Sequence, residues 1–113
     1  MEDAIAIIRL TAFLRYLELE KNSSLLTIQN YETDIRLFIT FLQKRVGAVF
    51  WKNVTVLDIR AYLALMNNEK YARRTIARRI SSLRSFYKFL VRENYVKSNP
   101  FLKIKTVGIF LIP

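Results

Sequence analysis

The scarcity of turn-forming residues most limits how this 113-residue chain can fold, since it contains only two glycines and two prolines. Sheets whose strands are joined by tight turns depend on both residue types, because glycine supplies positive φ and proline presets φ. Long helices joined by few connections need far fewer of either. Hydrophobic residues make up 52% of the chain, which is enough to build one core. The composition therefore predicts a single all-α domain.

Apolar residues recur at helical spacing in four segments of the chain. We expect helices over residues 4–20, 27–45, 55–68 and 73–93, with one further turn at 101–104. Together they predict a compact bundle of four main helices.

The first two expected helices carry more apolar residues than one buried face needs. The first helix has two stripes, one of Ile5, Ile8, Ala12, Tyr16 and Leu19 and one of Ile7, Leu10, Leu14 and Leu17. In the second, Leu37 and Phe41 lie opposite the core face. We interpret both patterns as burial on two sides. The two-striped first helix also supports an alternative function, a helical protein-interaction module that binds a partner through this helix.

Residues typical of helix ends mark several boundaries. Thr27 is the expected N-cap of the second helix and Gly47 its end. Thr55 and Asp58 have the spacing of a capping box at the start of the third helix. Asn94 is expected in a left-handed conformation after the fourth.

The chain contains neither cysteine nor histidine. This excludes disulfides, Cys-based metal sites, histidine ligands or bases, and Ser–His or Cys–His nucleophiles. We expect no catalytic residue, no metal, no cofactor and no small-molecule substrate. The acidic amino terminus is unlike a signal peptide, and the longest apolar runs, residues 46–51 and 107–112, are too short to cross a bilayer. We therefore expect a soluble, cytoplasmic protein that has no membrane partner.

The positive charge is concentrated in one part of the chain. Residues 1–69 carry eight Lys/Arg and eight Asp/Glu, whereas residues 70–113 carry eleven Lys/Arg and only Glu93. The whole net charge of +10 therefore lies after residue 69. Such asymmetry indicates a polyanionic partner. Nucleic acid is favoured over an anionic membrane, because the apolar face of the basic helix is needed for the core.

One face of the fourth expected helix is basic along its whole length. Its core face consists of Ile76, Ile80, Leu83, Tyr87, Leu90 and Val91. Opposite runs a strip, here called the basic strip, made of Arg74, Arg78, Ser81, Ser85, Lys88 and Arg92. Arg84 and Ser82 flank it. An ordinary solvated face would interleave acidic residues at i, i+4 spacing, and this one does not. The resulting self-repulsion favours a surface that contacts DNA.

Two segments and a dipeptide resemble known motifs. Residues 24–38, SLLTIQNYETDIRLF, are similar to S-x-x-T-x-x-x-Y-x-x-D-L-x-x-F, and residues 74–90, RTIARRISSLRSFYKFL, are similar to T-I-A-R-x-L-S-A-L-R-S-F-Y-x-F-L. Asn99-Pro100 follows at the matching place. Over residues 5–105 the chain thereby resembles the N-terminal core-binding domain of tyrosine recombinases and phage integrases, in particular their Xer-like branch.

The resemblance implies a SAM-like helical domain that forms one half of a clamp around double-stranded DNA during DNA integration or recombination. It also implies other recombinase subunits as partners and a separate C-terminal catalytic domain, so that this chain alone is not an enzyme. We expect residues 1–105 to form the DNA-binding domain. Residues 106–113 are expected to be an apolar tail or linker toward the catalytic domain, although family linkers are usually polar.

Candidate DNA contacts come from the basic strip, its flanks and two helix starts, where backbone amides can bind phosphate. The set is Lys21, Asn22, Ser23, Thr27, Asn30, Arg73, Arg74, Thr75, Arg78, Arg79, Ser82, Ser85, Lys88 and Arg92. Most aromatic residues have core spacing. Phe89 is the exception, since it is expected near the polar side of its helix.

Overall fold

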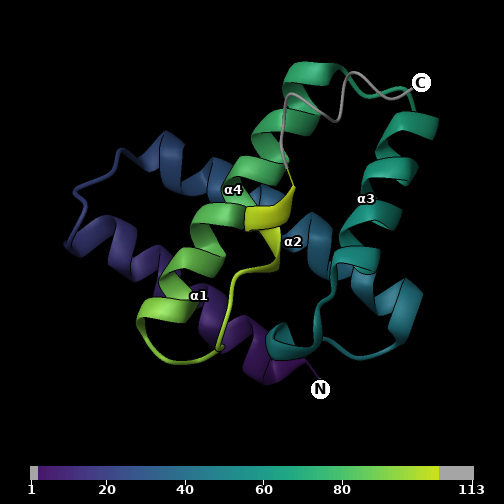
Figure 1. Ribbon diagram of the computed structural model, residues 1–113. Coiled ribbons are helices and arrows are strands. Elements are labelled where there is room, and N and C mark those ends of the chain that lie inside the picture. The colour runs from purple at the N-terminus through teal and green to yellow at the C-terminus, as the bar shows by residue number, and fades with distance from the viewer. Residues whose placement is uncertain (1–2, 105–113) are drawn as a thin grey trace. The chain divides into compact units, whose positions relative to one another are not determined.

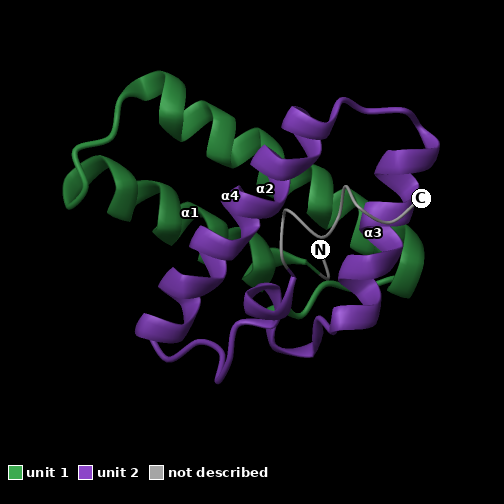
Figure 2. Ribbon diagram, turned by 45° about the horizontal axis from the view of Figure 1, so that its top comes forward, with its two compact units in different colours: residues 1–51 green, residues 52–113 purple. Residues whose placement is uncertain are grey.

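The computed structural model describes residues 3–104 and contains four α-helices, two 3₁₀ turns and no strand within that range (Figure 1). The predicted all-α class with four main helices is confirmed. The chain divides into two compact units, residues 1–51 and 52–113 (Figure 2). Within the described range, no helix combines the length and apolar character needed to cross a membrane. The expected tail, residues 106–113, lies outside the described residues.

The first unit is built from two helices that pack against each other, α1 (Ala4–Leu19) and α2 (Leu25–Val46). The Phe13 ring of α1 meets Tyr31 of α2 edge-on, with 5.4 Å between their centroids. The buried side chains of the two helices include Ala6, Leu10, Phe13, Leu17, Ile35, Phe38, Ile39 and Leu42. On α2 the buried face runs from Ile35 to Leu42.

The prediction that α1 and α2 are buried on two sides is wrong. On α1, Ile5, Ile8 and Leu19 are 58%, 53% and 71% exposed. On α2, Leu37 is exposed, while Phe41 is half-buried and stacks on Phe38. A helix that packs along one face buries a stripe about 100° wide, so a second apolar stripe stays in contact with solvent.

The N-cap of α2 is Ser24 and not the predicted Thr27. Ser24 has an extended backbone, and its Oγ accepts a hydrogen bond from the Thr27 backbone N–H at 3.2 Å. The same hydroxyl donates to Thr27 Oγ1 at 2.9 Å. The helix therefore begins at Leu25, two residues earlier than expected, because the serine hydroxyl satisfies an amide of the first turn. Gly47 ends α2 as predicted, at a φ of 90°.

Polar contacts hold the segment after α2 against the start of α1. The Asp3 carboxylate accepts a hydrogen bond from Val49 N at 2.7 Å and another from Gln43 Nε2 at 2.6 Å. Trp51 Nε1 donates to the Ala6 carbonyl oxygen at 3.1 Å. Residues forty or more positions apart are thereby joined within this unit.

The second unit contains α3 (Val56–Asn68), α4 (Arg73–Arg92) and the 3₁₀ turn η2 (Pro100–Lys103), and η1 (Trp51–Asn53) lies at the unit boundary. The turn η2 packs against both α3 and α4 (Figure 1). Its Phe101 ring lies 5.4 Å from the ring of Tyr87 on α4. The predicted further turn after Asn99-Pro100 is confirmed.

Sequence signals at the ends of α3 and α4 are also confirmed. Thr55 Oγ1 accepts from Asp58 N at 3.2 Å, and Asp58 Oδ2 accepts from Thr55 N at 2.9 Å, which completes the capping box. Asn94 has a φ of 65° after the end of α4. On α4 the predicted core residues are buried, except Val91, which is half-buried.

Candidate nucleic-acid interface

Helix α4 has a polar face and a buried face, and the predicted basic strip lies on the polar one. The residues of the strip that are exposed are Arg74, Arg78, Ser81, Lys88 and Arg92. Ser85 is half-buried. The buried face includes Ile76, Ile80, Leu83, Tyr87 and Leu90, each fully enclosed. The amphipathic assignment of α4 is therefore confirmed, and its exposed face carries the row of cations.

No acidic residue occurs between Lys70 and Arg92, so α4 has no internal acid–base pair. The next residue, Glu93, bonds to Arg92, with 3.0 Å between Arg92 Nη2 and Glu93 Oε2. The Arg92 guanidinium also lies 5.7 Å from the centre of the Phe89 ring. The excess of positive charge on α4 is therefore concentrated before Arg92.

The two helix starts that the sequence predicts as phosphate contacts differ in how they are capped. The N-cap of α4 is Ala72, which has no side-chain acceptor, and no acidic residue lies in the first turn. Its terminal amides can bind a phosphate. At the start of α2, by contrast, the Ser24 hydroxyl already accepts from Thr27 N. The first turn of α4 therefore lacks the side-chain cap that the first turn of α2 has.

The predicted contacts of the first unit are mostly exposed. Lys21, Asn22, Thr27 and Asn30 are exposed, and Ser23 is half-buried. They lie around the connection between α1 and α2, and Asn22 has a positive φ of 52°. In the second unit Arg73 is exposed and Thr75 half-buried. The structure therefore gathers the predicted residues into two groups, one in each unit.

Ser82 does not belong to the exposed surface, since it is only 7% exposed. The buried arc of α4 is wider than the predicted core face, because it also includes Phe86 and Phe89. Ser82 lies on that widened arc, because Phe86 and Phe89 follow it at i+4 and i+7 on the same side of the helix. Phe89 is a packing residue, at 6.5 Å from the Tyr95 ring. The prediction of Ser82 as a DNA contact is therefore wrong, because its side chain is enclosed by the fold.

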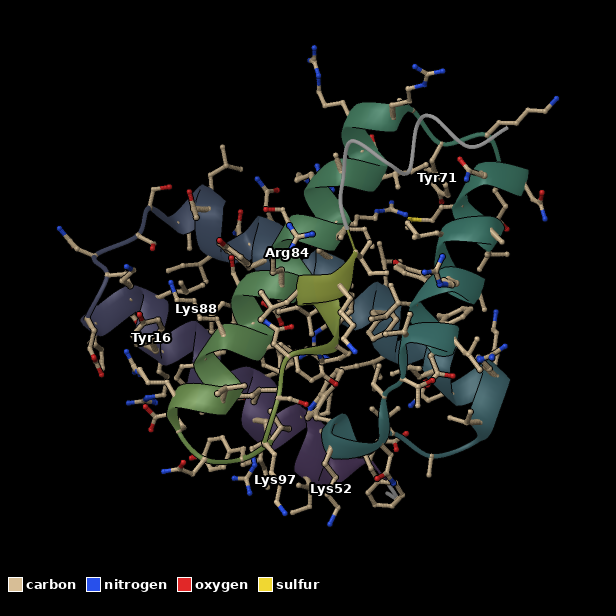
Figure 3. The ribbon with its side chains drawn as sticks, viewed as in Figure 1. Tyr16, Lys52, Tyr71, Arg84, Lys88 and Lys97 are labelled. Carbon is tan, nitrogen blue, oxygen red and sulfur yellow. The ribbon has the colours of Figure 1, made fainter. Side chains whose placement is uncertain are left out.

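Arg84 lies on α4 (Figure 3) and has structural partners that the sequence did not reveal. Its guanidinium donates to the carbonyl oxygens of Ile104 at 2.6 Å and Phe101 at 3.3 Å. In return, Asn99 Nδ2 donates to the Arg84 carbonyl oxygen at 3.1 Å. The only sequence signal was that Arg84 lies beside the basic strip and not within it. It holds η2 on α4.

Tyr87 is a packing residue, as its core spacing predicts. Its side chain is fully enclosed and touches the rings of Phe86 and Phe101. Burial, followed by the negative charge of Asp58, raises the pKa of the Tyr87 hydroxyl well above its ordinary value. This hydroxyl stays protonated at neutral pH. Among residues 3–104, no cluster of His, Cys, Asp or Glu is arranged to hold a metal.

Comparison with known proteins identifies the family to which this helical arrangement belongs. Residues 10–94, from within α1 to the end of α4, match the model of the phage integrase N-terminal SAM-like domain. The chain belongs to this family. The family predicted from the sequence motifs is thereby confirmed. The matched region includes helices of both units.

Curated relatives with similar SAM-like sequence are named tyrosine recombinase XerC. The chain is 47% identical to that of Halalkalibacterium halodurans over 96 residues, which cover 85% of this chain and 31% of the relative. It is 42% identical to that of Oceanobacillus iheyensis over 92 residues, covering 81% of this chain and 30% of the relative. The chain thus spans about three tenths of these relatives' length. No solved structure matches it.

Proposed function

We propose that this chain is the DNA-binding module of a site-specific tyrosine recombinase and grips duplex DNA as one half of a clamp at the recombination site. The observation that carries the proposal is the exposed basic strip of α4, which lies in a segment without any acidic residue from Lys70 to Arg92. Family membership and relatives named tyrosine recombinase support the same function.

Within this module, Arg74, Arg78, Lys88 and Arg92 contact DNA. Arg74, at the start of α4, binds a phosphate together with the uncapped amides. Arg78, one turn further in, reads a base edge, because the planar guanidinium can donate two hydrogen bonds to guanine. The second group of contacts comes from Lys21, Asn22, Ser23, Thr27 and Asn30 in the first unit.

The chain supplies binding and not chemistry. Residues 1–105 form the DNA-binding domain, and residues 106–113 lead toward a separate catalytic domain that acts in the cytoplasm with other recombinase subunits. A nicked duplex that traps covalent protein–DNA intermediates tests this division. The chain alone should form no adduct, and an adduct would overturn the assignment.

A salt titration of duplex binding, followed by fluorescence anisotropy, tests the proposed function. Neutralising about four to six phosphates predicts a log–log slope of roughly −4 to −5. Arg78→Ala should weaken binding, whereas the matched control Arg36→Ala should not, since Arg36 lies on α2 and pairs with Glu32. Binding that stays flat between low and physiological salt would contradict the proposal. Anionic vesicles should compete poorly with duplex DNA.

A second candidate function rests on the exposed apolar face of α1. Ile5, Ile8 and Leu19 are each more than half exposed, which suits a helical protein-interaction module. Ile8→Glu separates the two functions. If α1 serves protein interaction alone, the variant loses assembly with recombinase subunits and keeps its affinity for DNA.

A further inference from the structure

Arg78 and Arg79 are adjacent in sequence, but their environments differ. Arg78 is exposed, whereas Arg79 is half-buried. The Arg79 guanidinium carbon lies 4.3 Å from the centre of the Tyr71 ring. Arg79 Nε is buried and has no hydrogen-bond acceptor among residues 3–104. We call this contact the Arg79–Tyr71 stack. Through this contact the Arg79 guanidinium is engaged by the protein itself.

Tyr71 belongs to the short connection between α3 and α4 (Figure 3). Lys70 N donates to the Asn67 carbonyl oxygen at 3.0 Å, and Tyr71 N donates to the Met66 carbonyl oxygen at 3.1 Å. Together with the positive φ of Lys70, 61°, these bonds form a Schellman motif at the end of α3. They fix the backbone of the connection on its α3 side.

The Arg79–Tyr71 stack fixes the same connection on its α4 side. Side chains on a helix lean toward its N-terminus, so Arg79 can reach back over two turns to Tyr71. A buried N–H without an acceptor loses its hydration, and the aromatic ring offers the cation partial compensation. The guanidinium is planar and can lie on the ring, which a lysine ammonium cannot reproduce. The connection between α3 and α4 is therefore tied to both helices.

We propose that Arg79 is a positioning residue that acts through Tyr71, and not a direct DNA contact. The Arg79–Tyr71 stack holds the connection in the conformation that presents Lys70, Arg73 and Arg74 to the DNA backbone. All three side chains are exposed. The inference rests on the proposed DNA-binding function and revises the role of one residue within it.

Salt-dependent duplex binding separates positioning from contact, because the log–log slope counts the phosphates that are neutralised. Tyr71→Ala removes no charge, and Tyr71 is 41% exposed, so the variant should fold. It should weaken binding about three- to tenfold at fixed salt, because the connection must then be ordered on binding. The slope should stay unchanged, because Lys70, Arg73 and Arg74 still neutralise the same phosphates in the complex. Tyr71→Phe keeps the ring face and should bind like the parent. Arg79→Lys keeps the charge but loses the planar stack, and should behave like Tyr71→Ala.

A double variant completes the test. Arg79→Lys should have no further effect in a Tyr71→Ala background, since the two residues act as one unit. Amide hydrogen exchange supplies a readout without DNA. The backbone amide of Lys70 and that of position 71 should exchange faster in Tyr71→Ala than in Tyr71→Phe, after correction for the intrinsic exchange rate of each side chain. Unaltered exchange in Tyr71→Ala would overturn the stack as the element that holds the connection.

Two outcomes distinguish failure of this inference from failure of the proposed function. In the first outcome the parent binds DNA, Tyr71→Ala binds equally well, and Arg79→Ala lowers the magnitude of the salt slope by about 0.9. Arg79 is then a phosphate contact, so the positioning role fails while the proposed function stands. If the parent shows no salt-dependent duplex binding, the proposed function fails, and the positioning role fails with it.

Discussion

Nη2 of Arg84 donates a hydrogen bond of 2.6 Å to the carbonyl oxygen of Ile104. This contact joins the middle of α4 to the segment that follows η2, and the Nε of the same side chain donates to Phe101 O. Both acceptors belong to residues that are themselves buried. A residue of the most basic helix in the chain is thus used to hold the fold together.

Arg84→Ala should therefore lower the free energy of unfolding by about 1–3 kcal/mol, because two carbonyl groups lose a charged donor. Urea denaturation followed by circular dichroism measures the change. Arg78→Ala is the matched control, since it removes an exposed arginine from the same helix and should alter stability by no more than about 0.5 kcal/mol. Equal stability of the two variants would show that the Arg84 contacts contribute little.

The two faces of α4 should separate stability from binding. Tyr87→Ala should cost about 3–5 kcal/mol of stability, because it empties a fully enclosed aromatic site. Arg78→Ala should keep its stability and lose about 1–3 kcal/mol of DNA affinity if the guanidinium reads a base edge. In that case the loss depends on the DNA sequence. A loss of affinity that is equal for all DNA sequences, together with a salt-dependence slope smaller in magnitude by about one, would identify a phosphate contact instead.

Lys70→Gly should raise stability and weaken DNA binding at the same time. Lys70 has a φ of 61°, which glycine adopts without the steric cost of a Cβ. The gain should be about 0.5–1 kcal/mol in thermal or urea unfolding, after allowance for the greater flexibility of glycine in the unfolded chain. Loss of one cation should lower the salt slope by about 0.9. Parental affinity in this variant would exclude Lys70 from the DNA surface.

The stability of the first unit should depend on pH through Asp3. Hydrogen bonds from Gln43 and from the Val49 backbone lower the pKa of the Asp3 carboxyl below its ordinary value of 3.8. Because the folded pKa is the lower one, the stabilisation is present above pH 3.8 and is lost as the pH falls through the folded pKa. Asp3→Asn should be less stable than the parent at neutral pH. The difference should shrink in acid, and a difference independent of pH would contradict this role.

Much of this protein could be predicted from the sequence because the decisive signals are local. The scarcity of glycine and proline, the helical period and the Thr55–Asp58 spacing each act within a few residues. They were sufficient for four helices, for the buried face of α4 and for its exposed basic strip. Sequence motifs were also sufficient to recognise the family.

Tertiary structure decided which residues of an amphipathic helix are used for packing. Ile5 and Ile8 match the helical period as well as Leu10 does, yet only Leu10 is buried, because packing covers one face of α1. Ser82 and Arg84 both flank the basic strip. Ser82 is buried, however, and Arg84 donates a hydrogen bond to the carbonyl oxygen of Ile104. Periodicity gives the angle at which a side chain leaves its helix. What that side chain meets there depends on residues distant in the sequence, and no local pattern encodes them.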